Sequence, residues 1–534
     1  MSHTGTPPAP PPPPPASARA LARAGLAVTV AFLASRLLGW LRVVVISQAF
    51  PSPADLDPYL AAFRIPDLIY QLVAAGAVGS ALIPVLTQLL SDGQETRASR
   101  VASSVLNLML VALAGVSIVM FVWAPQLVPF LVDGFDPARA EATVHLTRIM
   151  LLSPIFLALG AVASAVLNTR GRFVVPSLAP VAYNLAIIGC TVALGGAMGI
   201  DAVAVGVVVG SVLHLGIQVP QLRRAMDYAP TIDLGDPAAR QTLRLMIPRA
   251  IGLGVIQITV LVNTSLAAGL AAGSVTAYFL AFTILQIPLG VIGFPMGVVL
   301  LPSLSRAIAT RHMGDFRVLV ERSMRLLLWL TLFIVTTGIA LRVPTVQVLF
   351  GGLSGEVLDW TASTLAWFLV GLPAHALNVV LTRAFYSDQD TRTPVVLACL
   401  SVAVNVVVSV ALVGSMGLAG LALGVALGGW FETITLSAIL ARRTGAVPLA
   451  SIARGAALSL GGAIVAGVVA LAGWALAASA VGDAPGRLVM LVAGGVVGLA
   501  ALAAYLLYSR IMGIPELPQT VRLLRAALRR GGDA

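Results

Sequence analysis

The sequence contains no lysine, so its 33 strongly basic residues are all arginines. This absence excludes a phosphate-loop lysine, a Schiff base and an attachment point for pyridoxal phosphate. The two cysteines, Cys190 and Cys399, fall in apolar segments and indicate neither a disulfide framework nor a metal cluster. The five histidines are scattered without metal-ligand spacing, at His3, His145, His214, His312 and His375. We therefore expect no enzyme, no cofactor and no metal site.

Charged residues are also scarce: they make up 10% of the chain, against roughly a quarter in soluble domains. Hydrophobic residues make up 58%. Apolar runs of about 20 residues recur along the whole length, which predicts an all-α polytopic membrane protein. We expect about 14 transmembrane helices, at approximately 23–50, 57–90, 101–132, 143–168, 174–198, 201–221, 240–270, 273–305, 317–350, 357–386, 393–413, 417–441, 452–480 and 486–510.

The predicted helices fall into two sets of six, followed by two extra helices. Short stretches recur in the same order in both sets, such as "RLLG" at 36–39 and "RAIG" at 249–252. Because six is an even number, both lobes would have the same orientation, and two such lobes around a central cavity are typical of a transporter. The predicted regions are a Pro-rich disordered cytoplasmic tail at 1–22, an N-terminal lobe at 23–228, a C-terminal lobe at 229–443, two extra helices at 444–511 and a basic amphipathic tail at 512–534.

The arginines are distributed unevenly between the two sides of the predicted membrane. The even-numbered connections and both chain ends hold most of them, whereas the opposite connections hold only Arg139, Arg342 and Arg487. Short arginine-rich loops face the cytoplasm, so we expect both termini inside. This pattern explains the net charge of +11 without a nucleic-acid partner. The tail from residue 512 is expected to lie on the membrane lipid.

Several charges fall inside the predicted helices. Arg36 lies near the predicted midplane, and Arg42 lies about 9 Å further out on the same helix. Arg64 and Arg249 add two cations, and Asp57 lies on the same predicted helix as Arg64. Exposing such a cation to lipid costs roughly 2.5–3.5 kcal/mol on insertion scales, so we expect a central cavity between the lobes. A cavity with net positive charge suits an anionic substrate, because arginine binds a phosphate group through two parallel hydrogen bonds.

The carboxylates in or beside these helices leave alternatives open. Asp57, near the outer mouth, is either a helix cap or a partner for Arg42. Glu432 is either the partner of an arginine or a binding group for a proton or a monovalent cation. Asp390, in a loop before a predicted helix, fits a capping arrangement better than ion binding. Glu432, Asp390 and Asn405 are the candidates for ion coupling.

Many residues of the predicted helices match, in order, the pattern of a known family over about residues 30–400. They are Ser35, Arg36, Gly39, Arg42, Asp57, Arg64, Pro66, Leu167, Asn168, Thr169, Arg172, Phe173, Pro176, Pro180, Asn184, Gln218, Pro220, Asn263, Thr264, Gly273, Ser274, Pro288, Gly290, "LLPSLS" at 300–305 and "FYSDQDTRTP" at 385–394. This pattern resembles the MurJ family, also called MviN, of lipid II flippases. That family belongs to the multidrug/oligosaccharidyl-lipid/polysaccharide exporter superfamily.

The resemblance implies a bacterial plasma-membrane protein of two six-helix lobes, whose last two helices form a groove for a lipid tail. It implies that Arg36 and Arg42 are cavity arginines needed for function and that Asp57 is a functionally important acid. Ser35, beside Arg36, belongs to the same matching stretch. With Arg64 and Arg249, these residues are the candidate substrate-binding set.

The sequence departs from the family pattern at four places. A further arginine of the second helix is Tyr70 here, and the "EGA" motif of that helix is Ala-Gly-Ala at 75–77. The arginine of the eighth helix is Thr283, and the acid after the second arginine of the first helix is Val43. Arg249 is expected to replace part of the missing positive charge.

The leading hypothesis is a flippase that moves lipid II, a polyprenyl-pyrophosphate-linked peptidoglycan precursor, from the inner to the outer leaflet by alternating access. No nucleotide site is visible, so the membrane potential or a monovalent cation would drive it. Two alternatives stay open. One is an exporter of another lipid-linked glycan or amphiphile, which Tyr70 and Thr283 favour. The other is a non-transporting membrane scaffold that recruits partners through residues 1–18. The expected partners are the anionic lipid-linked substrate, membrane lipid and the peptidoglycan-synthesis machinery.

Overall fold

The computed structural model describes residues 18–73, 77–445, 447–481 and 486–522. Within these ranges every regular element is a helix and no strand occurs, which confirms the all-α prediction. Most of the predicted Pro-rich tail at 1–22 and the end of the predicted basic tail lie outside the described residues, so those two predictions stay predictions.

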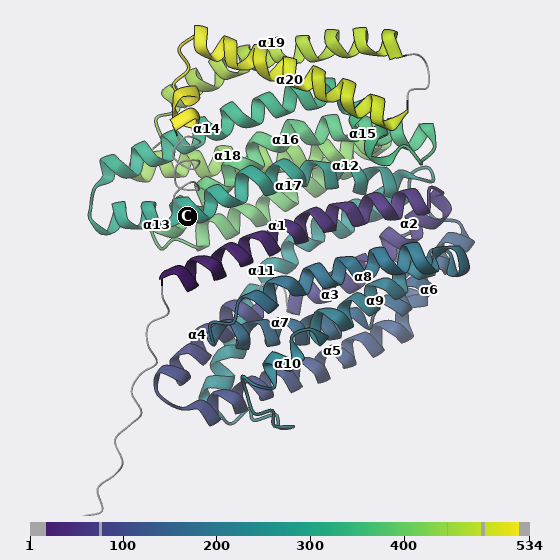
Figure 1. Ribbon diagram of the computed structural model, residues 1–534, viewed down its shortest axis with the longest axis vertical. Helices are drawn as coiled ribbons and strands as arrows, with labels where there is room; N and C mark the ends of the chain where they lie inside the picture. Colours follow the sequence, from purple (N-terminus) through teal and green to yellow (C-terminus); the bar gives the residue numbers. More distant parts are fainter. Residues whose placement is uncertain (1–17, 74–76, 446, 482–485, 523–534) are drawn as a thin grey trace, which may run out of the picture.

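The first half of the chain forms ten helices that pack mainly on one another (Figure 1). They are α1 (Ala18–Ala49), α2 (Pro53–Ala62), α3 (Arg64–Val73), α4 (Ala77–Ser91), α5 (Glu95–Leu131), α6 (Pro137–Met150), α7 (Ser153–Thr169), α8 (Val174–Met198), α9 (Asp201–Gly216) and α10 (Val219–Leu222). We call α1–α10 the amino-terminal group.

The second half, apart from α11 (Pro237–Ala268), forms the upper part of Figure 1, and α11 runs down among the helices of the amino-terminal group. The helices that follow α11 are α12 (Ser274–Pro288), the π-helical turn η1 (Leu289–Gly293), α13 (Phe294–Ala309), α14 (Met313–Ala340), α15 (Arg342–Phe350), α16 (Gly355–Ser387), α17 (Arg392–Met416), α18 (Leu418–Thr444), α19 (Leu449–Val481) and α20 (Arg487–Ile511). We call α12–α20 the carboxy-terminal group. Helix α11 packs on both groups, against α3, α4 and α5 and also against α17.

Twelve helices in the described ranges are long and apolar enough to cross a membrane. The remaining two predicted spans are the broken segment α2–α3–α4 and the helix α11, so the expectation of about 14 holds as an approximate number. The predicted single helix at 57–90 is wrong in detail, because α2 ends at Ala62 and α3 begins at Arg64. Pro66, in the first turn of α3, accounts for the break since it has no N–H to continue the helix from α2.

In the carboxy-terminal group, α17 and α18 approach each other closely at the glycines of α18. Gly420, Gly424 and Gly428 recur every four residues along α18. A Cβ at these glycines would lie 2.8 Å or less from atoms of α17, among them the Ser409 hydroxyl and the Ser401 carbonyl. This stripe of small residues lets the two backbones pack in contact, as is common in membrane helix pairs.

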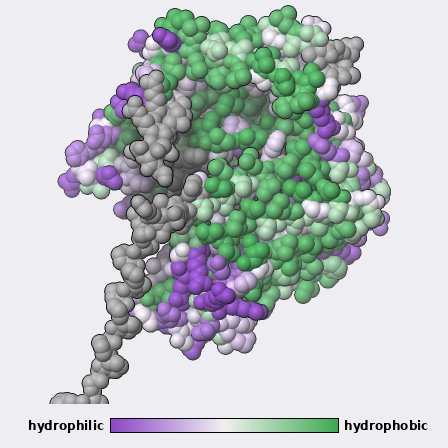
Figure 2. Space-filling model, in the orientation of Figure 1, coloured by the Kyte–Doolittle hydropathy of each residue, from purple (hydrophilic) through white to green (hydrophobic). Residues whose placement is uncertain are grey.

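Hydrophobic side chains cover the middle of the molecule, and hydrophilic side chains gather at its left and right ends in Figure 2. Large hydrophobic side chains are exposed along the spanning helices, such as Val192 of α8 and Leu476 of α19, each 72% exposed. The bundle therefore presents a lipid-facing belt, with its helix ends on either side. The predicted boundaries between the lobes, at 228 and 443, stay predictions.

The two groups of helices meet differently at the two ends. At the right-hand end of Figure 1, α2 packs against α12. At the left-hand end, α4 packs mainly on α7 and α11, while α13 packs mainly on α16 and α14. The groups are therefore joined at the end where α12 begins, which we call the α12 end, and lie apart at the opposite end, which we call the α13 end.

Candidate functional site

Asp57 joins the two groups at the α12 end. The backbone N–H of Gly273 donates a hydrogen bond to its Oδ2 at 2.6 Å. The N–H and the hydroxyl of Thr276 donate to its Oδ1 at 2.8 and 2.6 Å. Because Gly273 is the N-cap of α12, a side chain of α2 satisfies the open N–H groups of a helix in the other group. The helix-cap alternative is confirmed, and the arginine nearest to the carboxylate is Arg139 of α6, at 3.7 Å, rather than Arg42.

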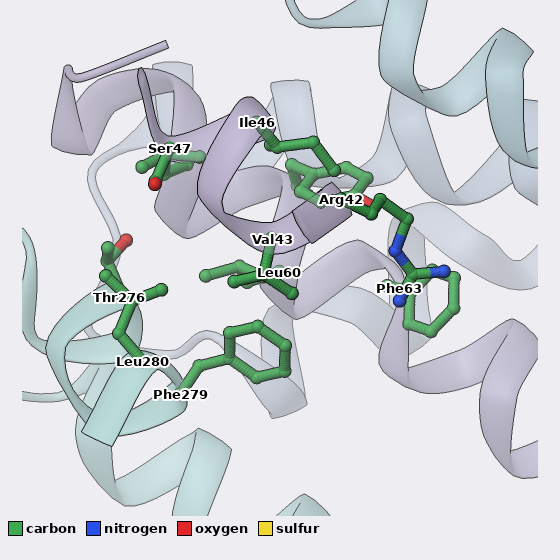
Figure 3. A pocket seen from close by; sticks show the side chains of 11 residues that line it. Arg42, Val43, Ile46, Ser47, Leu60, Phe63, Thr276, Phe279 and Leu280 are labelled. Atoms are coloured by element: carbon green, nitrogen blue, oxygen red, sulfur yellow. The ribbon is translucent and has the colours of Figure 1, made fainter. Parts of the chain in front are cut away.

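Arg42 lines a small cavity between α1, α2 and α12. The cavity has a volume of about 40 Å³ and is bordered by Tyr59, Phe63 and Phe279 among others. Figure 3 shows the Arg42 side chain extending beside the ring of Phe63, while Thr276 lies on the opposite side of the cavity. The guanidinium carbon also lies 5.8 Å from the centre of the Tyr183 ring of α8. We call this the Arg42 cavity.

Arg64 faces a larger cavity of about 330 Å³. Apart from Arg64 itself, its walls come from α11, α12, η1, α16 and α18; their polar members are Thr259, Tyr278, Gln286 and His375. The guanidinium carbon of Arg64 lies 5.1 Å from the centre of the Phe279 ring. We call this the Arg64 cavity. A cation of the amino-terminal group thus faces a cavity built by the carboxy-terminal group and α11.

The two cavities share one wall residue, Phe279 of α12. The sequence predicts one central cavity, and the structure instead places Arg42 and Arg64 in two cavities on either side of this ring.

Arg42 and Arg64 form no salt bridge within the described ranges, and the carboxylate that acts electrostatically on both is that of Asp67 on α3. Among the residues that the structure describes, no carboxylate oxygen lies within 4.0 Å of either guanidinium. The Nε atom of each is buried and has no hydrogen-bond acceptor. Aromatic faces stabilise such cations only in part, and a buried N–H without an acceptor is costly. The Nε–H of each side chain is therefore left as an unused donor among the described residues.

Arg36 lies at the middle of α1, near the π-helical turn η1 that connects α12 and α13. Its side chain is exposed, and its guanidinium carbon lies 5.3 Å from the centre of the Phe32 ring. A Cβ added to Gly290 of η1 would lie 3.6 Å from its Nη1. Isolated π-helical turns often occur at functional sites. The carbonyl oxygen of Ser35 accepts a hydrogen bond from Asn184 of α8 at 3.5 Å, which holds α1 against α8.

The positions that lack the family arginines are filled by neutral side chains. Tyr70 packs beside a small apolar cluster that includes Leu113 and Leu151. The hydroxyl of Thr283 donates to the carbonyl of Phe279 within α12. Arg249 lies in α11, but its side chain is outside the described part of the chain, so its predicted role stays a prediction.

Asn405 belongs to a buried polar network between α11, α12 and α17. It is 3% exposed, and its Oδ1 accepts from Asn263 at 3.4 Å. Asn263 also donates to the Tyr278 hydroxyl at 2.9 Å, and Tyr278 lines the Arg64 cavity. The Oδ1 of Asn263 has no donor. The network connects the predicted ion-coupling residue Asn405 to the cavity wall.

Asp390 caps the first turn of α17, as its sequence context predicts. The Thr393 N–H donates to its Oδ1 at 2.9 Å and the Thr393 hydroxyl to its Oδ2 at 2.6 Å. Arg443 of α18 donates to the same Oδ2 at 2.6 Å. With these donors in place, the carboxylate serves as a cap and an ion-pair partner at the α13 end; its predicted role in ion coupling stays untested.

Acid should weaken this loop in a way that depends on Asp390. The hydrogen bonds from Thr393, and then the Arg443 guanidinium, lower its pKa from 3.8 to about 2. The folded state therefore gains stability above the ordinary pKa and loses it as the pH falls from about 4 towards about 2. We expect Asp390→Asn to reduce the acid-induced drop in thermal unfolding midpoint of the purified protein. The control Asp388→Asn, in the same loop, should leave that drop unchanged; equal drops in the wild type and Asp390→Asn would contradict the prediction.

Two cavity residues carry no local sequence signal. His375 and Gln286 both line the Arg64 cavity. Each is a polar residue with apolar neighbours on both sides in the sequence, a pattern that is equally typical of helices with no site. Arg139 was predicted only as a loop residue, although it lies beside Asp57.

A family model described as "Lipid II flippase MurJ" matches residues 46–506. The chain belongs to the MurJ family. Curated relatives include a probable lipid II flippase MurJ of Rhizobium meliloti, 32% identical over 77% of this chain and 79% of the relative. A second is the lipid II flippase MurJ of Burkholderia cenocepacia, 29% identical over 79% of this chain and 84% of the relative.

The fold is similar to that of solved members of this family and of multidrug transporters. A structure described as lipid II flippase MurJ in an inward closed conformation aligns over 91% of this chain and 98% of its own, with a TM-score of 0.77 and 21% identity. An inward-facing MATE-family multidrug resistance transporter aligns over 77% of this chain and 95% of its own, with a TM-score of 0.69 and 17% identity. At these identities the likeness concerns the fold alone.

Proposed function

We propose that this chain moves lipid II from the inner to the outer leaflet by alternating access between its two groups of helices. The observation that carries the proposal is the pair of guanidinium groups that project from the amino-terminal group. Arg42 faces a cavity between α1, α2 and α12, and Arg64 faces a cavity walled by the carboxy-terminal group and α11. Neither forms a salt bridge among the described residues, and the carboxylate that acts electrostatically on both is that of Asp67.

The chemistry of the substrate head suits these cations. A pyrophosphate offers several anionic oxygens, and each guanidinium can donate two parallel hydrogen bonds to one phosphate group. The larger cavity adds neutral polar groups, Gln286 and Thr259, suited to sugar hydroxyls. The polyprenyl tail, being apolar, would remain in lipid beside the bundle. Transfer of this kind breaks no covalent bond.

The way the two groups meet suggests how loading occurs. The Asp57 cap closes the α12 end. At the opposite end, α4 packs mainly on α7 and α11, and α13 packs mainly on α16 and α14. Arginine-rich loops lie at the α13 end, so that end, with both termini, is proposed to face the cytoplasm. In this arrangement the head enters from the inner leaflet, and opening the α12 end would release it outside.

The driving force is proposed to be the membrane potential or a monovalent cation. An anionic head moving outward is favoured by an inside-negative potential, at about 2.3 kcal/mol per charge and 100 mV. Glu432, Asp390 and Asn405 remain the proposed coupling residues. Peptidoglycan-synthesis enzymes would supply lipid II on one side and consume it on the other.

Replacing Arg36 by alanine should abolish translocation of lipid II while leaving the protein in the membrane. Its guanidinium lies beside the π turn of the other group, where the head must pass between α1 and α12. The measurement is delivery of fluorescent lipid II to the outer leaflet of proteoliposomes. Arg148→Ala is the matched control, because Arg148 is also in a span but donates to the Phe121 carbonyl on its own group. Normal translocation by Arg36→Ala would count against the proposal.

A second candidate is an exporter of another lipid-linked glycan or amphiphile. The neutral residues Tyr70 and Thr283, at positions where the family pattern has arginine, favour a less anionic substrate. Complementation of a strain depleted of its own lipid II flippase separates the two. Growth supports lipid II as the substrate, and failure by a correctly inserted protein supports the alternative.

A further inference from the structure

A polar seam lies between α16 and α18. Glu432, the fifteenth of the 27 residues of α18, accepts a hydrogen bond from Nδ2 of Asn378 at 3.1 Å. The Thr433 hydroxyl lies 2.7 Å from the Oδ1 of the same asparagine. No salt bridge of Glu432 occurs within the described ranges. The carboxylate is therefore held by a neutral amide in the middle of a membrane-spanning helix.

Glu432 points to the interior of the bundle. Ile434, two residues on, is 62% exposed, and Leu427 is 42% exposed, so these two mark the lipid-facing side of α18. At 100° per residue, Glu432 lies about 160° around the helix from Ile434. An ionisable side chain that faces the interior of a membrane bundle is a functional candidate, because carrying its charge there is costly.

The amide beside Glu432 is fixed with its donor towards the carboxylate. Two acceptors surround Nδ2 of Asn378: the Glu432 carboxylate and the Gly429 carbonyl, at 3.1 and 3.5 Å. An atom between two acceptors must be the NH₂ group. A metal cation requires oxygen ligands, whereas this side of the carboxylate is occupied by N–H groups. The arrangement favours a proton over a metal cation as the charge that neutralises Glu432.

His375 lies between this seam and the Arg64 cavity. It is one turn before Asn378 on α16 and lines the cavity. The imidazole ring of His375 also packs against α18 at Gly429. A Cβ added to that glycine would lie 2.8 Å from the Cε1 atom of the ring. Gly429 is one turn before Glu432, so His375 and Glu432 occupy neighbouring turns of the same helix contact. The helices packed against α18 also carry other ionisable side chains, among them Tyr278 on α12, Cys399 on α17, Arg383 on α16 and Arg249 on α11, whose side chain is outside the described part.

We propose that Glu432 is a proton-binding site that exchanges protons with the Arg64 cavity through His375. A ring nitrogen of His375 takes a proton from cavity water, and the proton then passes to a carboxylate oxygen of Glu432, which restores the neutral imidazole and leaves a neutral carboxyl. This inference rests on the proposed function, in which the cavity holds an anionic head. Because that head and the Glu432 carboxylate repel each other, binding of the anion and binding of the proton must favour each other by linkage.

The test is an infrared difference titration of the full-length protein in liposomes. A buried carboxyl that takes up a proton gains a C=O stretching band as the pH falls. We expect Glu432→Gln to lose one such band. Glu356→Gln is the matched control, because Glu356 is an exposed residue at the start of α16, and it should keep the band. Persistence of the whole band in Glu432→Gln would overturn the proposal, as would a band that responds to sodium at constant pH.

A second variant keeps the test decisive if Glu432→Gln does not accumulate in the membrane. Glu432→Asp withdraws the carboxyl by one methylene from Nδ2 of Asn378, so the titration midpoint of the band must shift; an unchanged midpoint would contradict the assignment. Inorganic pyrophosphate then tests the linkage: its addition should cause proton uptake by the wild type and none by Glu432→Gln. If the chain fails to move lipid II but the band is lost in Glu432→Gln, the proton site stands and the proposed substrate is wrong.

Discussion

Replacing Asp57 by alanine should open the α12 end of the bundle and abolish directional transport. The change removes the acceptor of three hydrogen bonds from the first turn of α12. Loss of an N-cap costs roughly 0.5–2 kcal/mol, which shifts an open–closed equilibrium about 2- to 30-fold. Leu60 lines the Arg42 cavity and is 7% exposed, so a cysteine at this position reports opening. We expect an impermeant maleimide applied from the α12 end to label it faster by that factor.

The controls for this experiment are available within the chain. Cys190 and Cys399 are replaced by alanine so that only the introduced cysteine reacts. Asp55→Ala, on the same helix but with no role in the cap of α12, should leave the labelling rate unchanged. An unaltered rate in Asp57→Ala would show that the closure does not depend on this carboxylate.

Replacing Arg64 by alanine should weaken binding of lipid II by about 10- to 100-fold. Hydrogen bonds to charged groups contribute roughly 1.5–3 kcal/mol each. Among the described residues the Arg64 guanidinium forms no salt bridge that must break before it binds a phosphate. The measurement is titration of the purified protein with lipid II. Arg64→Lys should recover only part of the affinity, because an ammonium group cannot bind a phosphate through a planar pair of N–H groups.

Arg148→Ala serves as the control for this titration as well, and should bind like the wild type. Equal affinity of Arg64→Ala and the wild type would mean that the larger cavity does not hold the phosphates. Binding of the phosphates would then depend on Arg36 and Arg42 alone.

Local sequence patterns are sufficient to predict much of the fold. Apolar runs located the spans because the length of a spanning helix is set by the thickness of the membrane. They missed the break at Phe63, where α2 ends and α3 begins, since the run of apolar residues continues across it. The capping role of Asp390 was predicted because its partner Thr393 is three residues away.

The parts of the site that depend on distant contacts were beyond such patterns. Asp57 was recognised as a cap or an ion-pair partner, but its partners lie 216 and 219 residues away along the chain. The division of the predicted cavity follows from the position of one ring, Phe279, which no pattern of spacing specifies. His375 was seen only as a scattered histidine, because its role depends on packing against Gly429 of another helix.

Photo-crosslinking of lipid II inside the Arg64 cavity tests the central claim most directly. Val379 lines this cavity, and Val192, 72% exposed on the apolar belt, is the matched control. A photoreactive residue at 379 should capture lipid II through its head, at a yield that falls at least about tenfold in the Arg64→Ala background. A residue at 192 should not capture the head in either background. Absence of the crosslink at 379, or a yield independent of Arg64, would contradict the claim that this guanidinium binds the phosphates of the substrate.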